Sequence, residues 1–88
     1  MATVLLPRSL LALFPGVEKR NDVDGGTVGE LISGLDASVP GMRDRLVEAG
    51  PRLRPHINVF VDGRRERDLA APLSEASVVH IIPAVAGG

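Results

Sequence analysis

The C-terminal residues 78–88 constrain the fold of this 88-residue chain more than any other segment. Residues 78–82 are β-branched at four of five positions, which is typical of a packed strand. Pro83 follows, and because proline has no backbone N–H, it ends the ladder of strand hydrogen bonds. The pattern therefore predicts a domain, residues 1–83, that ends in a strand and is followed by a thin flexible tail, residues 84–88.

The tail is suited to entering another protein. Its side chains are small: Ala84, Val85, Ala86, Gly87 and Gly88. If extended, six residues from Pro83 reach about 20 Å, at roughly 3.3 Å per residue. Glycine lets another backbone approach closely, so we expect Gly87 to give clearance and Gly88 to present the reactive carboxyl group. The alternative is that the Gly-Gly pair is only a frayed chain end.

Four further segments have the alternation or composition of strands. They are residues 3–6, 17–23, 57–61 and 64–68. Pro7 closes the first of them, and Asp62-Gly63 is a strong hairpin-turn signal after the third. The apolar run 10–14 is too short to span a bilayer, and we expect it to form a loop that covers part of the core.

One amphipathic helix is predicted between the two strand pairs. Thr27 and Glu30 have the spacing of a capping box, which marks a helix start. Apolar residues follow at i, i+3, i+4 and i+7, a spacing that places them on one face: Val28, Leu31, Ile32 and Leu35. Residues 42–48 can add a short helical turn. The order β-β-α-β-β predicts an α+β fold, with one mixed sheet of four or five strands packed on one main helix.

Composition excludes several functions. The chain has no cysteine, which excludes disulfides, thiolate metal sites and cysteine nucleophiles. Ten Lys and Arg against eleven Asp and Glu give a net charge of −1, so no basic field is available for nucleic acid. His56 and His80 have no metal-ligand spacing around them. We expect a cytoplasmic protein with no metal, no nucleic-acid partner and no membrane partner.

The C-terminus resembles that of a known family. The resemblance is carried by Ile81-Ile82-Pro83-Ala84-Val85-Ala86-Gly87-Gly88, which is similar to the end of the ubiquitin-like sulfur carriers of the MoaD/ThiS family, most of all to carriers of a cysteine-biosynthesis route. The resemblance implies a ubiquitin-like β-grasp fold in which the first and last strands pair in parallel at the sheet's centre. It also implies a protein cosubstrate rather than an enzyme.

The resemblance further implies a two-step chemistry at Gly88. A free carboxylate is a poor target for nucleophiles, so an E1-like adenylyltransferase of the MoeB/ThiF type would use ATP to adenylate Gly88. Sulfur would then displace AMP and leave a thiocarboxylate. The carrier would bind no cofactor itself, and the sulfur on Gly88 would pass to an acceptor enzyme. A pyridoxal-phosphate (PLP)-dependent cysteine synthase is the implied acceptor, and molybdopterin and thiamin pathways remain open.

A partner also needs a surface to hold. Phe60 alternates with the apolar residues of its strand and is expected on the sheet's solvent face, where an aromatic side chain can anchor an interface. Ile82 and Val85, near the root of the tail, would extend that patch. The alternative is that Phe60 only covers the sheet through cross-strand pairing.

Two other functions stay open on sequence grounds. The first is a protein modifier that is conjugated through Gly88 to a target lysine. The second is a β-grasp interaction module without catalytic activity, in which the Gly-Gly ending is incidental.

Overall fold

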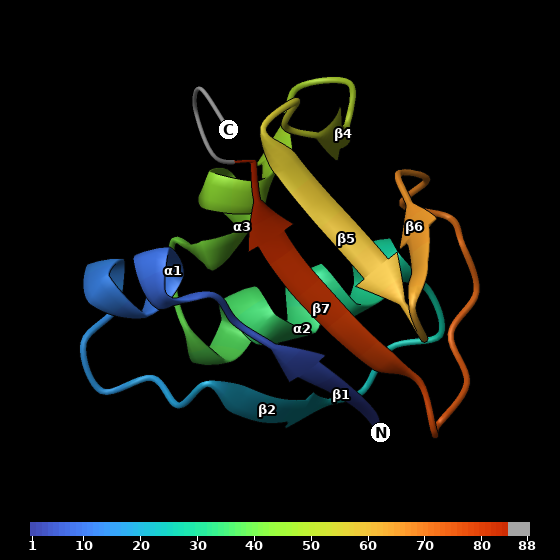
Figure 1. Cartoon of the computed structure of the whole chain (residues 1–88), viewed down its shortest axis with the longest axis horizontal. Coiled ribbons are helices and arrows are strands. Elements are labelled where there is room, and N and C mark those ends of the chain that lie inside the picture. Colours follow the sequence, from blue (N-terminus) through green and yellow to red (C-terminus); the bar gives the residue numbers. More distant parts are fainter. Residues whose placement is uncertain (85–88) are drawn as a thin grey trace.

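The computed structural model describes residues 1–84 (Figure 1). The predictions for Val85, Ala86, Gly87 and Gly88 lie outside the described residues. In chain order the elements are β1 (Ala2–Leu5), α1 (Arg8–Leu13), β2 (Arg20–Val23), α2 (Val28–Ser38), α3 (Met42–Leu46), β3 (Val47–Glu48), β4 (Arg52–Leu53), β5 (Ile57–Val61), β6 (Arg64–Glu66) and β7 (Val78–Pro83).

Five of the strands form one mixed sheet in the order β2-β1-β7-β5-β6. β1 and β7 are parallel, with Val4 opposite Val79, and the other neighbours are antiparallel. The predicted α+β β-grasp fold, with its first and last strands parallel at the centre, is confirmed. β7 is hydrogen-bonded on both sides, so the strand that leads to the tail is the central strand of the sheet.

The main helix, α2, lies across one face of this sheet (Figure 1). The Thr27 hydroxyl accepts a hydrogen bond from the N–H of Glu30 at 3.1 Å, and the Glu30 carboxylate accepts one from the N–H of Gly26 at 2.9 Å. The reciprocal cap is as predicted, except that Glu30 reaches one residue beyond Thr27. The predicted apolar stripe is fully buried against the inner side chains of the sheet: Val28, Leu31, Ile32 and Leu35 against Val4, Val59, Val79 and Ile81.

The run 10–14 was expected to form a loop, and that expectation is wrong. The run lies largely in a short helix, α1, which begins after Pro7. The carbonyl of Pro7 accepts hydrogen bonds from the N–H groups of Leu10 and Leu11, both at 3.1 Å. Leu10 is 5% exposed and belongs to the core, so the segment covers the core as expected, but as a short helix of six residues rather than as a loop.

The sequence patterns did not predict a small hairpin formed by β3 and β4. Residues 42–48 were expected to form a helical turn, but α3 ends at Leu46 and the chain continues directly into β3. β3 and β4 pair over only two residues each, with Val47 opposite Leu53. Both of these side chains are buried, which explains why so short a ladder forms. No helix of the part of the chain that the structure describes is long and apolar enough to cross a membrane.

Candidate functional site

The face of the sheet opposite α2 carries a continuous row of five side chains, one from each strand. Leu5 lies opposite both Arg20 and His80, and Phe60 lies opposite both His80 and Arg65. Residues that lie directly opposite one another point to the same face of a sheet. We call these five residues the outer row. It has a cation at each end and, between them, two apolar side chains around a histidine.

Two exposed hydrophobic side chains lie beside the outer row on β7. Ile82 is 45% exposed and Val78 is 38% exposed, and they flank His80 on the same face of the strand. Phe60 is half-buried and points to this face, away from its buried neighbour Val59. The structure therefore brings Phe60 and Ile82 together on one surface, as predicted, while their contact with a partner stays a prediction.

An open cleft of about 220 Å³ adjoins the outer row where β1 and β7 end. Because β1 and β7 run parallel, their C-terminal ends lie at the same end of the sheet. The root of the tail, at the end of β7, is at that end too. The cleft is lined by Leu5, Leu6, Pro7, Lys19, His80, Ile81 and Ile82. Most of the lining is apolar, and Lys19 adds one positive charge. The cleft therefore suits a partner's apolar side chain that has an acidic residue next to it.

The root of the tail is held by the start of β5. Pro83 lies opposite Ile57, and the N–H of Ala84 donates to the carbonyl of His56 at 2.6 Å. Pairing thus continues one residue beyond Pro83. Ile81, two residues before Pro83, is 1% exposed and anchors the strand in the core. The root of the tail is therefore fixed both by backbone hydrogen bonds and by buried side chains.

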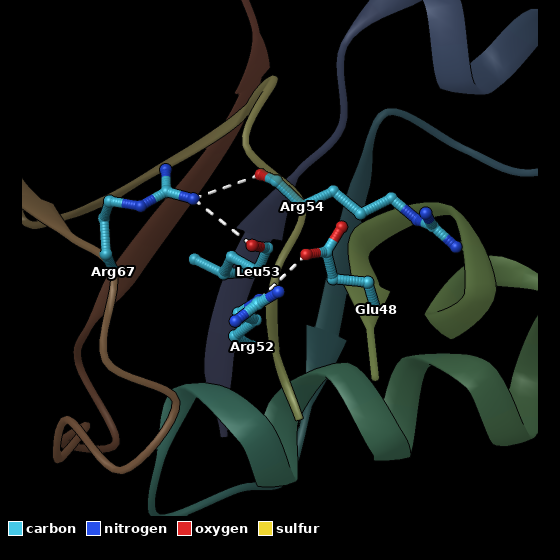
Figure 2. A network of polar contacts seen from close by, with 5 residues as sticks. All are labelled: Glu48, Arg52, Leu53, Arg54 and Arg67. Carbon is cyan, nitrogen blue, oxygen red and sulfur yellow. Dashed lines mark hydrogen bonds and ion pairs between the residues drawn. The ribbon is translucent and has the colours of Figure 1, made fainter. Parts of the chain in front are cut away.

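The two histidines do not form a metal site within residues 1–84, where no group of three His, Asp or Glu side chains lies close enough together to hold an ion. His80 faces away from α2 and lies at the centre of the outer row. His56 contributes its backbone carbonyl to the root of the tail. Two arginines in and after β6 differ in direction: Arg65 ends the outer row, whereas Arg67 turns back to main-chain carbonyls (Figure 2).

Sequence reasoning missed Leu5, Lys19 and Arg20 as parts of this surface. Leu5 alternates with buried Val4, which was a usable signal for its outward direction. The register that places Arg20 at the end of the row has no local signal, because pairing is decided by the whole sheet.

Comparisons with known proteins agree with this architecture. The family model described as "ThiS family" matches residues 4–88. The sulfur carrier protein CysO of Mycobacterium tuberculosis is 34% identical over 91 residues, which cover 98% of this chain and 97% of CysO. Small archaeal modifier protein 3 of Haloferax volcanii is 38% identical over 68 residues, or 74% of this chain and 73% of that protein.

Solved structures give the same assignment. A chain in the crystal structure of the Amycolatopsis orientalis BexX/CysO complex matches with a TM-score of 0.90 and 33% identity over 100% of both chains. Mycobacterium tuberculosis CysO matches with a TM-score of 0.85 and 29% identity over 97% of this chain and 100% of its own. These relatives are small protein cosubstrates rather than enzymes. The chain therefore belongs to the ThiS family of ubiquitin-like carrier and modifier proteins.

Proposed function

We propose that this protein is a sulfur carrier whose C-terminal Gly88 is activated and loaded by other enzymes. An E1-like adenylyltransferase of the MoeB/ThiF type joins the Gly88 carboxylate to the α-phosphate of ATP and releases pyrophosphate. A sulfur nucleophile then attacks the acyl carbon, AMP leaves, and Gly88 carries a thiocarboxylate. The carrier supplies the group to be modified and the partner supplies the chemistry, as with other group carriers.

One observation carries this proposal. The strand that leads to Gly87 and Gly88 is the central strand, β7, which is bonded on both sides and anchored by buried Val79 and Ile81. A chain end that is to be threaded into another protein needs a root that does not unravel, since ordering a loose segment costs conformational entropy at each encounter. Ala84, Val85 and Ala86 would form the stem between this root and the Gly-Gly pair.

The outer row supports a second part of the proposal, a docking face for the activating enzyme. Phe60 in the row and Ile82 beside it provide the apolar centre, and Val85 would extend it along the stem. Arg20 and Arg65 stand at the two ends of the row. The complementary surface on the partner is then apolar at its centre and acidic at its rim, an arrangement that gives orientation and a fast association rate as well as affinity.

The similarity to CysO favours cysteine biosynthesis as the destination of the sulfur. The acceptor would be a PLP-dependent cysteine synthase, which holds the cofactor, whereas the carrier holds only the sulfur on Gly88. Molybdopterin or thiamin precursor synthesis is the alternative destination within the same chemistry.

A second candidate function is protein modification through Gly88. The observation that favours it is the 38% identity to small archaeal modifier protein 3. Adenylation of Gly88 is common to both functions. They differ afterwards, because a modifier transfers its acyl group to a lysine amine, whereas a carrier accepts sulfur. A β-grasp interaction module that is never activated is the remaining alternative.

Reconstitution separates these functions. The protein is mixed with the MoeB/ThiF-type enzyme of the same organism, ATP and sulfide, and the intact mass is measured. A sulfur carrier gains the mass difference between sulfur and oxygen, and a variant that lacks Gly88 does not. Adenylation followed only by transfer to lysine would favour the modifier. Absence of ATP–pyrophosphate exchange in the presence of the wild-type protein would contradict both functions.

A further inference from the structure

One arginine outside the outer row holds the backbone next to the root of the tail. The guanidinium of Arg67 donates to the carbonyls of Leu53 at 3.3 Å, Arg54 at 3.1 Å and Ile57 at 2.8 Å. Figure 2 shows the first two of these contacts, with Arg67 reaching across from the segment after β6. A planar guanidinium presents five donors in a fixed fork, so a single side chain gathers three carbonyls of one short segment.

The carbonyls of Arg54 and Ile57 belong to the turn that carries His56, and Leu53 comes immediately before it. The N–H of Ile57 donates to the carbonyl of Arg54 at 3.0 Å, which closes the turn. The carbonyl of His56, inside the turn, accepts the hydrogen bond from Ala84. Arg67 and Ala84 therefore hold the same four-residue turn from two sides.

Arg67 is itself held in place. The Glu66 carboxylate accepts hydrogen bonds from the N–H groups of Arg67 and Asp68, both at 3.0 Å. Local contacts thus hold the backbone of the segment from which the Arg67 guanidinium reaches the turn. The connection runs from β6 through Arg67 to the turn, and from His56 to Ala84.

We propose that Arg67 is a positioning residue for the activation of Gly88, because it fixes the turn whose His56 carbonyl holds Ala84 at the root of the tail. The inference rests on the proposed function. Arg67 touches no reacting atom. Its contribution is to keep Ala84 ordered before the partner binds, so that less conformational entropy is lost when the tail enters the active site.

The test uses three variants of the full chain with the MoeB/ThiF-type enzyme of the same organism. Arg67→Gln removes the charged fork, and Arg67→Lys keeps the charge without the fork. Arg52→Gln is the matched control: it removes the same charge from a neighbouring position, where Arg52 pairs with Glu48 at 2.8 Å and not with the turn (Figure 2). Two quantities are measured for each variant: the dissociation constant of its complex with the MoeB/ThiF-type enzyme, and the rate of ATP–pyrophosphate exchange at saturating carrier.

We expect Arg67→Gln to lower kcat by roughly five- to thirty-fold, the factor that corresponds to ordering the backbone of one residue. The dissociation constant should change less than about twofold, because the docking contacts of the outer row are untouched, whereas the entropy cost of ordering Ala84 falls in the later step in which the tail enters the active site. Arg67→Lys should be slowed similarly, and Arg52→Gln should match the wild type. An unchanged kcat in both Arg67 variants, or a change in the dissociation constant alone, would overturn the proposal.

Amide hydrogen exchange in the isolated protein gives a readout that needs no partner. The Ala84 amide should be protected in the wild type and in Arg52→Gln, and should exchange at least several-fold faster in both Arg67 variants. Equal protection in all four proteins would refute the role of Arg67, even if Arg67→Gln lowered activity by unfolding. If the wild type is not adenylated at all, the proposed function fails, while this measurement still decides whether Arg67 orders Ala84.

Discussion

Two adjacent isoleucines on β7 allow the two faces of the sheet to be tested with the same substitution. Ile81 is 1% exposed and points to α2, whereas Ile82 is 45% exposed and points to the outer row. The side chains are identical and the backbone positions are neighbours. Replacing each in turn by alanine therefore separates the stability of the domain from the binding of its partner.

Ile81→Ala should destabilise the domain by about 2–5 kcal/mol, the cost of a large-to-small change at a buried site. Urea denaturation measures this loss as a lower free energy of unfolding. The dissociation constant of the folded fraction for the activating enzyme should stay close to that of the wild type, since the Ile81 side chain lies on the inner face. The reduced activity should follow the fraction of protein that is folded.

Ile82→Ala should leave stability within about 1 kcal/mol of the wild type, as expected for a side chain that is nearly half exposed and lies outside the core. Full burial of an isoleucine is worth about 1.5–3 kcal/mol. Docking can bury only the fraction now exposed, 45%, which corresponds to about 0.7–1.4 kcal/mol. The dissociation constant for the activating enzyme should therefore rise roughly three- to tenfold.

Calorimetric titration of both variants with the activating enzyme, next to urea denaturation of each, measures the two quantities. An Ile82→Ala variant that binds as tightly as the wild type would show that the outer face is not the docking face. A loss of 2 kcal/mol or more of stability at Ile82, a magnitude typical of core truncation, would show that the side chain belongs to the core.

Five further changes have defined outcomes. Deleting Gly88, or replacing Gly87 with tryptophan, should abolish ATP–pyrophosphate exchange while the melting temperature stays unchanged, because chain termini contribute little to the core; a clear drop in melting temperature would refute a free tail. Leu31→Ala, at 0% exposure, should cost about 2–5 kcal/mol in urea denaturation, and a mild effect would place the stripe of α2 outside the core. Thr27→Ala should lower the free energy of unfolding by about 1 kcal/mol through loss of the cap to Glu30; wild-type stability in urea denaturation would contradict this. Gly25→Ala should destabilise by about 1–3 kcal/mol through overpacking, because a Cβ there would lie 2.6 Å from the backbone nitrogen of Leu31; wild-type stability would mean that the turn can move.

Local patterns in the sequence predicted the elements that local chemistry determines. The cap at Thr27, the stripe that begins at Val28 and the strand that ends at Pro83 are each set by residues close together in the chain, and the structure has all three. The parallel pairing of β1 with β7 could not come from periodicity, because strand order depends on contacts between distant segments. Resemblance to a known family supplied it.

The remaining features depend on contacts that a single sequence does not display. α1 has no side chain that caps its first turn, so nothing in the sequence marked its start. The outer row requires the register of four strand pairs. The acceptors of Arg67 are backbone carbonyls, which look alike at every position in a sequence, so its role became visible only in the folded chain.

The state of Gly88 in the living cell decides whether the protein carries sulfur. The protein is isolated from its own organism with alkylation of thiocarboxylates, and the C-terminal peptide is analysed by mass spectrometry. We predict an alkylated thiocarboxylate on Gly88 in wild-type cells, and an unmodified carboxylate when the MoeB/ThiF-type enzyme is absent. An unmodified carboxylate in every growth condition, or Gly88 found only in isopeptide bonds to lysine, would contradict sulfur transfer.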